Sequence, residues 1–412
     1  MASDAPRPLL LISGGPSTRP LWPLLAEHYD LAFLYAPAGQ EAISQGLPAV
    51  ALAALMDVDL TEMVENQAAL LTGRIVAAMP QVAERFASAY GLSAPPALNG
   101  HMGDWFAGYA HHFLLGEIAI LAQLEKLKSS DRRIVGCLTH EDVAPDTRAM
   151  VAWCNAHDIP TIHVPHSPCH LLPGVVDIHR ETRTRWIAAS GPQVERFYVE
   201  SGFDSEHVRL TGAPQWDDLY HGAIPNKREA RAVLKVPDGL KVLTYQTTWG
   251  QTTSLRSEFE AEFDTGFAAT LAAAKALGTY LMVKIHWNDQ RPEREDYYAK
   301  QMDAAAVAGL VTRQHYSYVL AATDCLVAQG PSNMCIDAAI MGAPSVYLQT
   351  DGFDFATSYP RRCAPDGLLA EVQATLETPG DLSSFIRQYN SAHPDGNASE
   401  NVVSMVTELC GA

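Results

Sequence analysis

Residues 321–348 read AATDCLVAQGPSNMCIDAAIMGAPSVYL, and this stretch decides the predicted fold. An apolar run over residues 325–328 is followed by a glycine-containing turn and then by a helical apolar pattern over residues 334–341. Gly342 ends this pattern, and Pro344 opens a second apolar run. Strand, turn, helix, glycine stop and strand in this order predict a βαβ unit with short connections.

The turn before the predicted helix is a candidate anion site. Ser332 and Asn333 come at the first turn of the helix, where free backbone N–H groups meet the positive end of the helix dipole. Phosphate groups bind well in such a position. A plain packing turn with Ser332 as the helix cap is the alternative, and this stretch alone leaves both interpretations open.

Length, charge and cysteine usage restrict the class of protein. A chain of 412 residues exceeds what one hydrophobic core usually holds, so two domains are expected. The formal net charge of −18 argues against nucleic-acid binding, although it is compatible with a local basic site for an anionic substrate. No stretch reaches the roughly 18 consecutive apolar residues of a membrane helix. Seven cysteines without a CxxC pair predict reduced thiols and a cytoplasmic protein, with peripheral contact at the inner face of the membrane left open.

Strand and helix patterns alternate along the rest of the chain. The predicted strands are residues 8–13, 30–36, 49–55, 134–139, 160–164, 184–189 and 208–211, and then 241–245, 280–285, 310–312, 325–328 and 344–348. The alternation predicts an α/β protein with two Rossmann-like, doubly wound parallel-sheet domains that face a cleft. We predict a first domain over residues 1–222, a second over 223–390, and a C-terminal helix within 391–412 that packs back on the first domain.

Four motifs carry a resemblance to a known group of enzymes. They are HVPHSP (163–168), LTGAPQWDDL (210–219), MVKIHWN (282–288) and TDCLVAQGPSNMCIDAAIMGAPSVYL (323–348). In these motifs the chain resembles the GT-B superfamily of nucleotide-sugar-dependent transferases. Within it, the chain is similar to bacterial CDP-glycerol glycerophosphotransferases and related surface-polysaccharide enzymes, and to non-hydrolysing UDP-N-acetylglucosamine 2-epimerases. The resemblance covers about residues 134–348.

The chain departs from its relatives at identifiable positions. The relatives carry patterns such as TGNPRFD, K-x-HP and S-S/T-x-x-x-E-A-x-x-x-G-x-P. Asp337 stands for the glutamate, Ala213 for the asparagine and Trp287 for the proline that follows the histidine. Residues 330–333 match the DYSS motif of teichoic-type enzymes only in part. The acidic-Arg signature of the epimerases is not evident in residues 349–352, which disfavours the epimerase alternative.

The second domain is expected to hold the donor nucleotide. Lys284 and His286 lie at i and i+2 of one strand, so we expect a cation pair on one face that stabilises the leaving phosphate. Gly330, Ser332 and Asn333 would bind the donor's phosphate at the helix start. The resemblance further implies that Asp337 accepts hydrogen bonds from ribose hydroxyls. Thr247 and Thr248 either donate to phosphate oxygens or cap the next helix. The segment Gln314, His315 and Tyr316 lies where the backbone of the relatives contacts the nucleotide base of the donor.

The general base is expected in the first domain, because the acceptor hydroxyl must lose its proton. His166 matches the position of a family histidine and is the first candidate, and Glu141 and Asp142 follow another strand. Ser13, Gly14 and Gly15 follow the first strand and are expected to line the acceptor side. Two metal sites are weighed as alternatives. One is at His163, His166, His170 and His179, and the other is at the DxD triplet of Asp57 and Asp59, where a helix-capping role also explains Asp59.

These expectations combine into one predicted function. The chain is predicted to move a sugar or a polyol phosphate from a nucleotide-activated donor to a glycan acceptor in bacterial surface-polysaccharide synthesis. No cofactor and no metal are expected, and the partners are the nucleotide sugar and the glycan, with the oligomeric state left open. A sugar-nucleotide 2-epimerase and a non-catalytic GT-B-like binding protein are the alternatives.

Overall fold

The structure is a computed structural model of the chain. It describes residues 6–89, 101–130, 132–166, 182–222, 224–247, 256–287, 289, 291–329, 332–349, 359 and 361–411. Thr248 and Gly330 of the predicted donor site lie outside these residues, as do His170 and His179 of the alternative metal site.

The first sheet has seven strands in the order β3-β2-β1-β4-β5-β6-β7. They are β1 (Leu9–Ile12), β2 (Asp30–Phe33), β3 (Ala49–Ala51), β4 (Ile134–Thr139), β5 (Thr161–His163), β6 (Trp186–Ala189) and β7 (Val208–Leu210). All four residues of β1 are fully buried, as expected for a strand of a parallel sheet that is covered on both faces. The predicted strand over residues 49–55 is shorter in the structure, because η2 (Leu52–Leu55) replaces its second half.

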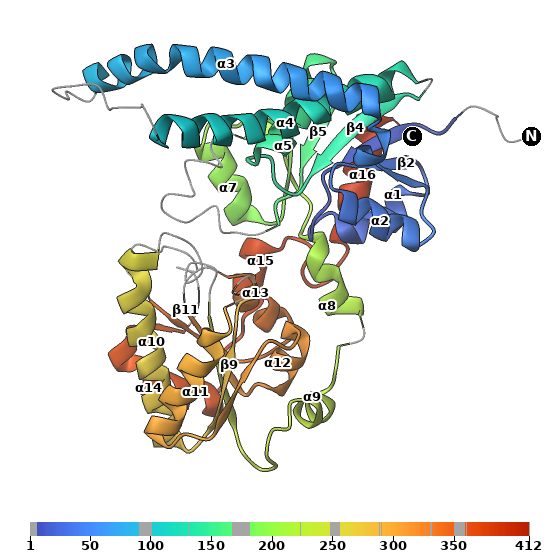
Figure 1. Ribbon diagram of the computed structural model, residues 1–412. Helices are drawn as coiled ribbons and strands as arrows, with labels where there is room; N and C mark the ends of the chain where they lie inside the picture. The colour runs from blue at the N-terminus through green and yellow to red at the C-terminus, as the bar shows by residue number, and fades with distance from the viewer. Residues whose placement is uncertain are drawn as a thin grey trace, which may run out of the picture. The chain divides into compact units, whose positions relative to one another are not determined.

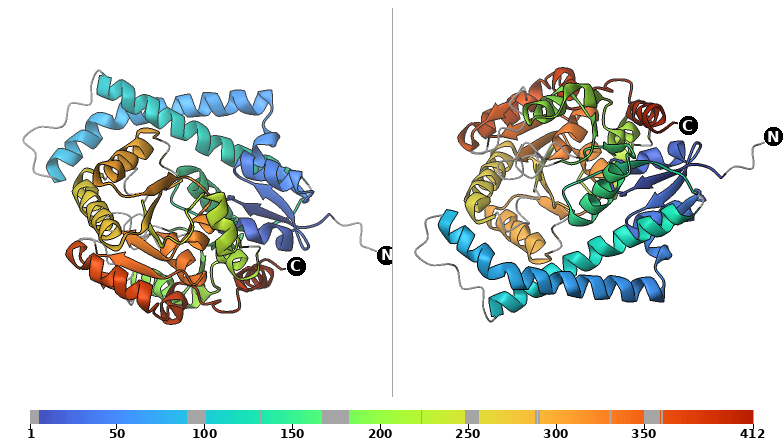
Figure 2. Two further views of the ribbon diagram at one scale, coloured as in Figure 1. Left: turned by 90° about the horizontal axis from the view of Figure 1, so that it is seen from below. Right: turned by 90° about the horizontal axis from the view of Figure 1, so that it is seen from above.

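The described helices of this part of the chain connect these strands or follow the last of them. They are η1 (Arg19–Leu21), α1 (Trp22–Leu25), α2 (Ala36–Ser44), α3 (Val58–Ala89), α4 (His101–Ser129), α5 (Pro145–Ala156), α7 (Pro192–Glu200), η4 (Ser205–His207), η5 (Pro214–Trp216) and α8 (Asp217–His221). The long helices α3 and α4 lie side by side (Figure 1 and Figure 2), and their contact includes a 3.2 Å hydrogen bond between Thr72 Oγ1 and His111 Nδ1.

The second sheet has six strands in the order β10-β9-β8-β11-β12-β13. They are β8 (Val242–Gln246), β9 (Tyr280–Lys284), β10 (Gly309–Thr312), β11 (Cys325–Gln329), β12 (Ser345–Leu348) and β13 (Arg362–Cys363). The described helices after α8 in the chain are α9 (Lys227–Val233), α10 (Arg256–Leu277), α11 (Glu293–Ala305), α12 (Tyr316–Ala322), α13 (Asn333–Ile340), η7 (Pro365–Gly367), α14 (Leu368–Glu377), α15 (Ser383–Tyr389) and α16 (Ala398–Cys410).

The side chains of this sheet alternate between two cores. Val242, Met282 and Leu326 pack with α9, α12 and α13 on one face. Their chain neighbours Leu243 and Leu281 pack with α10, α11 and α14 on the other face. The period of two residues therefore determines which helices a strand side chain can reach.

The βαβ unit that the sequence predicts is present as β11, α13 and β12. The two strands are parallel neighbours, with Gln329 opposite Leu348 at their carboxyl ends. Gly342 follows the helix with a φ of 69°, a left-handed conformation that suits glycine at a helix end. The predicted fold class, two parallel-sheet α/β domains, is thus confirmed.

The described chain packs as two compact units. Unit 1 comprises residues 1–164, 182–187 and 403–412, and unit 2 comprises residues 165–181 and 188–402. Within unit 1 the end of α16 packs on β4, where a Cβ on Gly136 would lie 2.3 Å from Cys410 Sγ. The predicted domain boundaries stay predictions. No helix in the described part of the chain is long and apolar enough to cross a membrane.

Candidate functional site

The carboxyl ends of β8 and β9 bring three predicted donor-site residues together in unit 2. Thr247 N donates to Lys284 O at 3.0 Å, and Thr247 Oγ1 accepts from His286 N at 2.8 Å. Gln246, the last residue of β8, lies directly opposite Lys284 in the strand register. Thr247 therefore joins the two strand ends, and it stays a candidate phosphate ligand through its hydroxyl proton.

Lys284 is a buried cation at this sheet edge. Its side chain is 8% exposed, and Nζ donates to Ile285 O at 2.7 Å. Burial, followed by the charge of Arg313, lowers the pKa of the ammonium to about 8. Among the residues that the structure describes, no carboxylate forms an ion pair with it. A buried charge without a counterion is costly, so the site favours an anionic ligand.

His286 is half-buried beside Lys284. Burial and the Lys284 charge lower the pKa of its imidazole to about 4, although Asp289 opposes this shift. The unliganded site therefore holds one cation and one neutral imidazole at pH 7, whereas the sequence analysis expects a pair of cations. The physical reason is burial, which disfavours the charged imidazolium, together with the like charge of Lys284.

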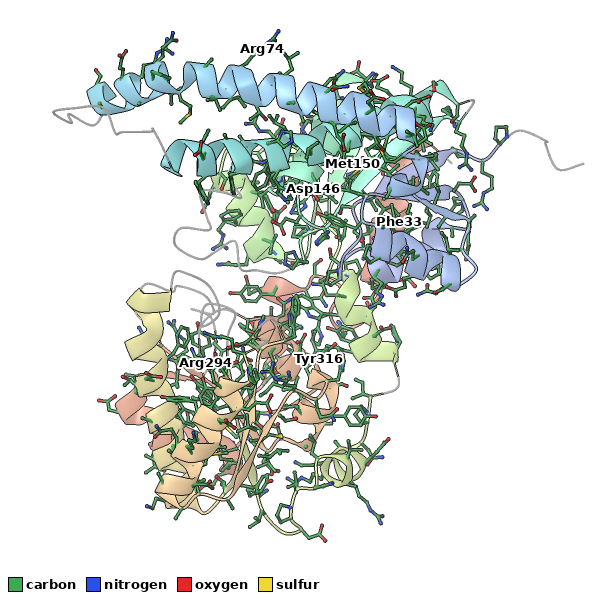
Figure 3. All side chains as sticks on the ribbon, in the orientation of Figure 1. Phe33, Arg74, Asp146, Met150, Arg294 and Tyr316 are labelled. Atoms are coloured by element: carbon green, nitrogen blue, oxygen red, sulfur yellow. The ribbon has the colours of Figure 1, made fainter. Side chains whose placement is uncertain are left out.

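An arginine network that the sequence analysis does not anticipate holds the loop after His286. Arg291 binds both carboxylate oxygens of Asp289, with Nε at 2.8 Å and NH2 at 2.7 Å. Arg294, labelled in Figure 3, forms an ion pair with Asp289 at 3.6 Å. Arg313 donates to the backbone oxygen of Asp289 and to Glu295. Burial raises the pKa of Asp289, but the Arg291 contacts outweigh it and hold the pKa below its usual value. Asp289 is thus occupied by arginine and does not neutralise Lys284.

The start of α13 makes two different contacts. Ser332 is the helix cap, since its hydroxyl accepts from Met334 N at 3.2 Å. Asn333 Nδ2 donates to the backbone oxygen of His166 at 2.9 Å, and Gln215 Nε2 donates to the same oxygen at 3.0 Å. The Asn333 amide protons therefore face the protein. The Asn333 Oδ1 and Gln215 Oε1 atoms are buried and have no hydrogen-bond partner among the described residues.

The hydrogen bonds from Asn333 and Gln215 attach the backbone of His166 to unit 2. The sequence analysis places His166 in the first domain, after β5, but its packing groups it with unit 2. The paired amides fix only its backbone, so the imidazole keeps its role as a candidate base. Arg and Ser or Thr stand in the relatives' patterns where this chain has Gln215 and Asn333, and the sequence alone gives no sign that these two positions meet.

Asp337 is held in the interior of unit 2. Its Oδ1 accepts from Trp216 Nε1 at 2.8 Å, and burial raises the pKa of the carboxyl to about 7 despite this bond. Tyr316, labelled in Figure 3, is the first residue of α12. Burial and the Asp337 charge raise its pKa well above the usual value. The predicted contact between Asp337 and ribose hydroxyls stays a prediction.

The other donor-site candidates lie before and at the start of α12. His315 caps this helix through Nδ1, which accepts from Ser317 N at 3.4 Å. Burial and Lys284 lower the pKa of His315, so its imidazole responds to the same charge as His286. Gln314 is exposed, and its backbone N–H binds Thr312 Oγ1 at 3.1 Å. Their proposed contact with the base stays a prediction.

In unit 1 Ser13 and Gly15, which follow β1, contact His140. Ser13 is fully buried, and its Oγ lies 3.1 Å from both Nδ1 and the backbone N of His140. A Cβ on Gly15 would lie 2.4 Å from His140 Cγ, and φ at Gly15 is 113°. Both the close contact and the backbone conformation therefore require glycine. The acceptor-side candidates Ser13 and Gly15 thus contact an imidazole that is not among the predicted site residues, whereas a Cβ on Gly14 would lie 2.8 Å from Ala38 Cβ.

The two acidic candidates for the base, Glu141 and Asp142, differ in burial. Asp142 is fully buried and accepts from Thr182 Oγ1, from Arg183 N, and from the N and Oγ1 of Thr184, at 3.0–3.3 Å. Both oxygens therefore anchor residues 182–184. Glu141 is half-buried, and its role as a candidate base stays a prediction.

The described residues give no support to either of the two alternative metal sites. Asp57 caps α3 by accepting from Leu60 N at 2.9 Å, and it pairs with Lys126 at 2.6 Å. The capping residue of the DxD triplet is thus Asp57 and not Asp59. In the described ranges no group of three or more His, Cys, Asp or Glu side chains could hold a metal ion.

The chain matches one protein-family model. The family model for CDP-Glycerol:Poly(glycerophosphate) glycerophosphotransferase matches residues 184–408, which is more than half of the chain. The chain belongs to this family. It is therefore a transferase of the kind that moves a sugar or a polyol phosphate from a nucleotide-activated donor, as the sequence analysis predicts. Comparison with curated protein sequences gives no match.

Solved structures support the fold. A UDP-GlcNAc 2-epimerase from Neisseria meningitidis bound to UDP-GlcNAc matches 97% of this chain and 99% of its own, with 12% identity and a TM-score of 0.59. A glycosyltransferase from Rickettsia africae matches 98% and 99%, with 8% identity and a TM-score of 0.56. Anabaena Alr3699/HepE in complex with UDP and glucose matches 98% and 95%, with 9% identity and a TM-score of 0.50. At these identities the likeness establishes the GT-B fold.

The shared carbonyl of His166 gives a testable prediction. Asn333→Ala and Gln215→Ala each leave one amide on that oxygen, so each single change should cost about 1 kcal/mol of unfolding free energy. The double variant removes both amides from the carbonyl, so its cost should exceed the sum by about 0.5–3 kcal/mol. Urea unfolding of the four proteins measures this coupling.

Ser332→Ala is the matched control, because it removes a helix cap on the same turn and does not touch His166. Combined with Gln215→Ala, it should give additive losses. Additive losses for the Asn333 and Gln215 pair as well would show that the two amides do not share the carbonyl in solution.

Proposed function

We propose that the chain transfers a polyol phosphate or a sugar from a nucleotide-activated donor to a hydroxyl group of a glycan acceptor, and that Lys284 binds the donor's phosphate. The observation that carries the proposal is the buried Lys284 ammonium, which has no carboxylate partner among the described residues. Family membership supports transfer from such a donor, and Thr247, His286 and Ser332 lie on the adjoining strand ends and helix start.

The proposed reaction needs one base and one site for negative charge. The acceptor oxygen forms a bond to the carbon or phosphorus that carries the transferred group, and His166 takes the hydroxyl proton. The bond to the nucleotide's phosphate oxygen breaks, and its electron pair stays on that phosphate. Lys284 stabilises this developing charge, and His286 can donate a hydrogen bond from its neutral ring.

The protein itself supplies positive charge to this phosphate, so we propose that turnover needs no metal ion and no cofactor besides the donor. Burial of Cys137, Cys154, Cys325 and Cys335 as free thiols supports action in a reducing compartment, which we propose to be the cytoplasm. The glycan acceptor, in surface-polysaccharide synthesis, follows from the resemblance to enzymes of that class.

Incubation with candidate donors tests the proposal. CDP-glycerol, UDP-glucose and UDP-N-acetylglucosamine are each mixed with the protein, with and without a glycan acceptor, and released nucleotide is measured. Acceptor-dependent release of CMP or of a nucleoside diphosphate is expected. Interconversion of sugar nucleotides without acceptor would identify an epimerase, and neither reaction would indicate a binding protein.

His166→Ala should lower kcat about 10²- to 10⁴-fold with little change in donor affinity, because a general base acts only in the transition state. The backbone carbonyl and its bonds to Asn333 and Gln215 persist in this variant, so its fold should be retained. Single-turnover rates and donor dissociation constants, measured side by side, separate the two effects.

His157→Ala is the control, since His157 binds the backbone of its own helix in unit 1 at 2.8 Å. Its rate should be normal. Normal rates for His166→Ala would move the base elsewhere, with Glu141 and His140 next in line, and a loss of donor binding would place His166 in the donor site.

Donor binding should weaken as the pH rises through about 8. Only the protonated form of Lys284 attracts phosphate, and the pKa of this group in the free protein is about 8. Above that pH, the affinity for a nucleoside diphosphate should fall by up to about tenfold per pH unit. Calorimetric titration between pH 7 and pH 10 measures the slope.

Lys284→Arg provides the comparison, because arginine stays charged throughout this range. Its affinity should change little between pH 7 and pH 10. An equal slope in both proteins would assign the titration to another group and remove Lys284 from the phosphate site.

A further inference from the structure

Two buried glutamines end neighbouring strands of the second sheet. Gln246 is the last residue of β8 and Gln329 the last residue of β11, and each is 1% exposed. Gln329 Oε1 accepts from Tyr245 OH at 3.0 Å, and its amide lies against Gly266 of α10. For Gln246, neither Nε2 nor Oε1 has a hydrogen-bond partner in the described part of the chain. The two glutamine side chains are equally buried, but only that of Gln329 has a hydrogen-bond partner among the described residues.

The strand register locates the Gln246 amide. Thr244, two residues earlier, binds Thr323 at 2.7 Å, just after α12, so Thr244 and Gln246 point to the face that α12 and α13 cover. Lys284 lies directly opposite Gln246 on β9, two residues after Met282 of the same core. Paired strands run about 4.8 Å apart, so the unpartnered amide and the uncompensated ammonium are neighbours on one face.

These two groups define the chemistry of the missing partner. Buried amides are nearly always hydrogen-bonded, and an exception calls for an explanation. Both groups lie at the carboxyl ends of adjacent strands, where parallel sheets bind their ligands. Lys284 requires an anionic oxygen. The Gln246 amide requires an acceptor for its N–H and a donor for its oxygen, and a hydroxyl group supplies both.

We propose that Gln246 binds a hydroxyl group of the transferred moiety next to its phosphoester, and so selects donors that carry a hydroxylated chain or ring. The substrate class is a phosphate ester of a polyol or sugar. This inference rests on the proposed phosphate site at Lys284. Gln246 is then a specificity residue: Lys284 holds the phosphate of any donor, and the amide distinguishes the group attached to it.

A pair of simple esters tests the selection without a nucleotide. Glycerol 3-phosphate and n-propyl phosphate carry the same anion and differ in the two hydroxyl groups. Wild-type protein should bind glycerol 3-phosphate about tenfold more tightly by calorimetry or NMR titration, as one or two added hydrogen bonds predict. Gln246→Met, of similar size and apolar, should bind both esters equally, with n-propyl phosphate unchanged.

Gln329→Met is the matched control. It alters an equally buried glutamine on the opposite face, so the preference for glycerol 3-phosphate should persist. Urea unfolding separates a structural role from a binding role. Gln329→Met should unfold at lower urea because Tyr245 loses its partner, whereas Gln246→Met should unfold at the wild-type concentration or above it. A loss of stability in Gln246→Met equal to that of Gln329→Met would overturn the proposal.

The outcomes separate this inference from the proposed function. If nucleotide donors are turned over but wild-type protein binds the two esters equally, the Gln246 assignment fails and the function stands. If Gln246→Met abolishes a preference for glycerol 3-phosphate while no nucleotide donor reacts, the site stands and the function fails. If wild-type protein binds neither ester, the Gln246 assignment is overturned.

Discussion

The buried ammonium of Lys284 is the constraint that governs the carboxyl edge of the second sheet. Removal of a charge from water is costly unless an opposite charge or hydrogen bonds compensate it, and the described residues offer only the Ile285 carbonyl. Its charge helps to lower the pKa of both His286 and His315. Asp289 follows on the same loop but is bound by Arg291 and Arg294, so the edge keeps its positive charge for a ligand.

Departures from the relatives' sequence patterns meet in space within unit 2. Ala213 lacks the amide of the usual asparagine, and Asn390 supplies one from elsewhere: its Oδ1 accepts from Ala213 N at 3.1 Å. Trp216, where relatives have phenylalanine, reaches Asp337, where they have glutamate, so a longer donor meets a shorter acceptor. Gln215 and Asn333 share one carbonyl. The substitutions therefore compensate one another in pairs and keep the η5 segment fixed to α13.

The sequence was sufficient for the fold, but not for the contacts of the candidate site residues. Strand periodicity, glycine stops and the βαβ pattern depend on local chemistry, so β11, α13 and β12 appear within one or two residues of the predicted bounds. The proximity of Thr247 to Lys284 follows from adjacent parallel strands. The neutral state of His286, the saturation of Asp142 by residues 182–184 and the contacts of Asn333 depend on residues far apart in the chain. No local pattern encodes these contacts.

Three amide side chains of unit 2 carry buried polar atoms that have no hydrogen-bond partner among the described residues. Gln246 ends β8 in the sheet interior, and Asn333 and Gln215 are fixed through His166. A buried oxygen without a donor lowers the stability of the free protein, and a ligand that donates to it recovers this loss on binding. Amides, unlike carboxylates, add no charge that would neutralise Lys284. An edge that combines one uncompensated cation with neutral amides is therefore suited to a ligand that is both anionic and rich in hydroxyl groups.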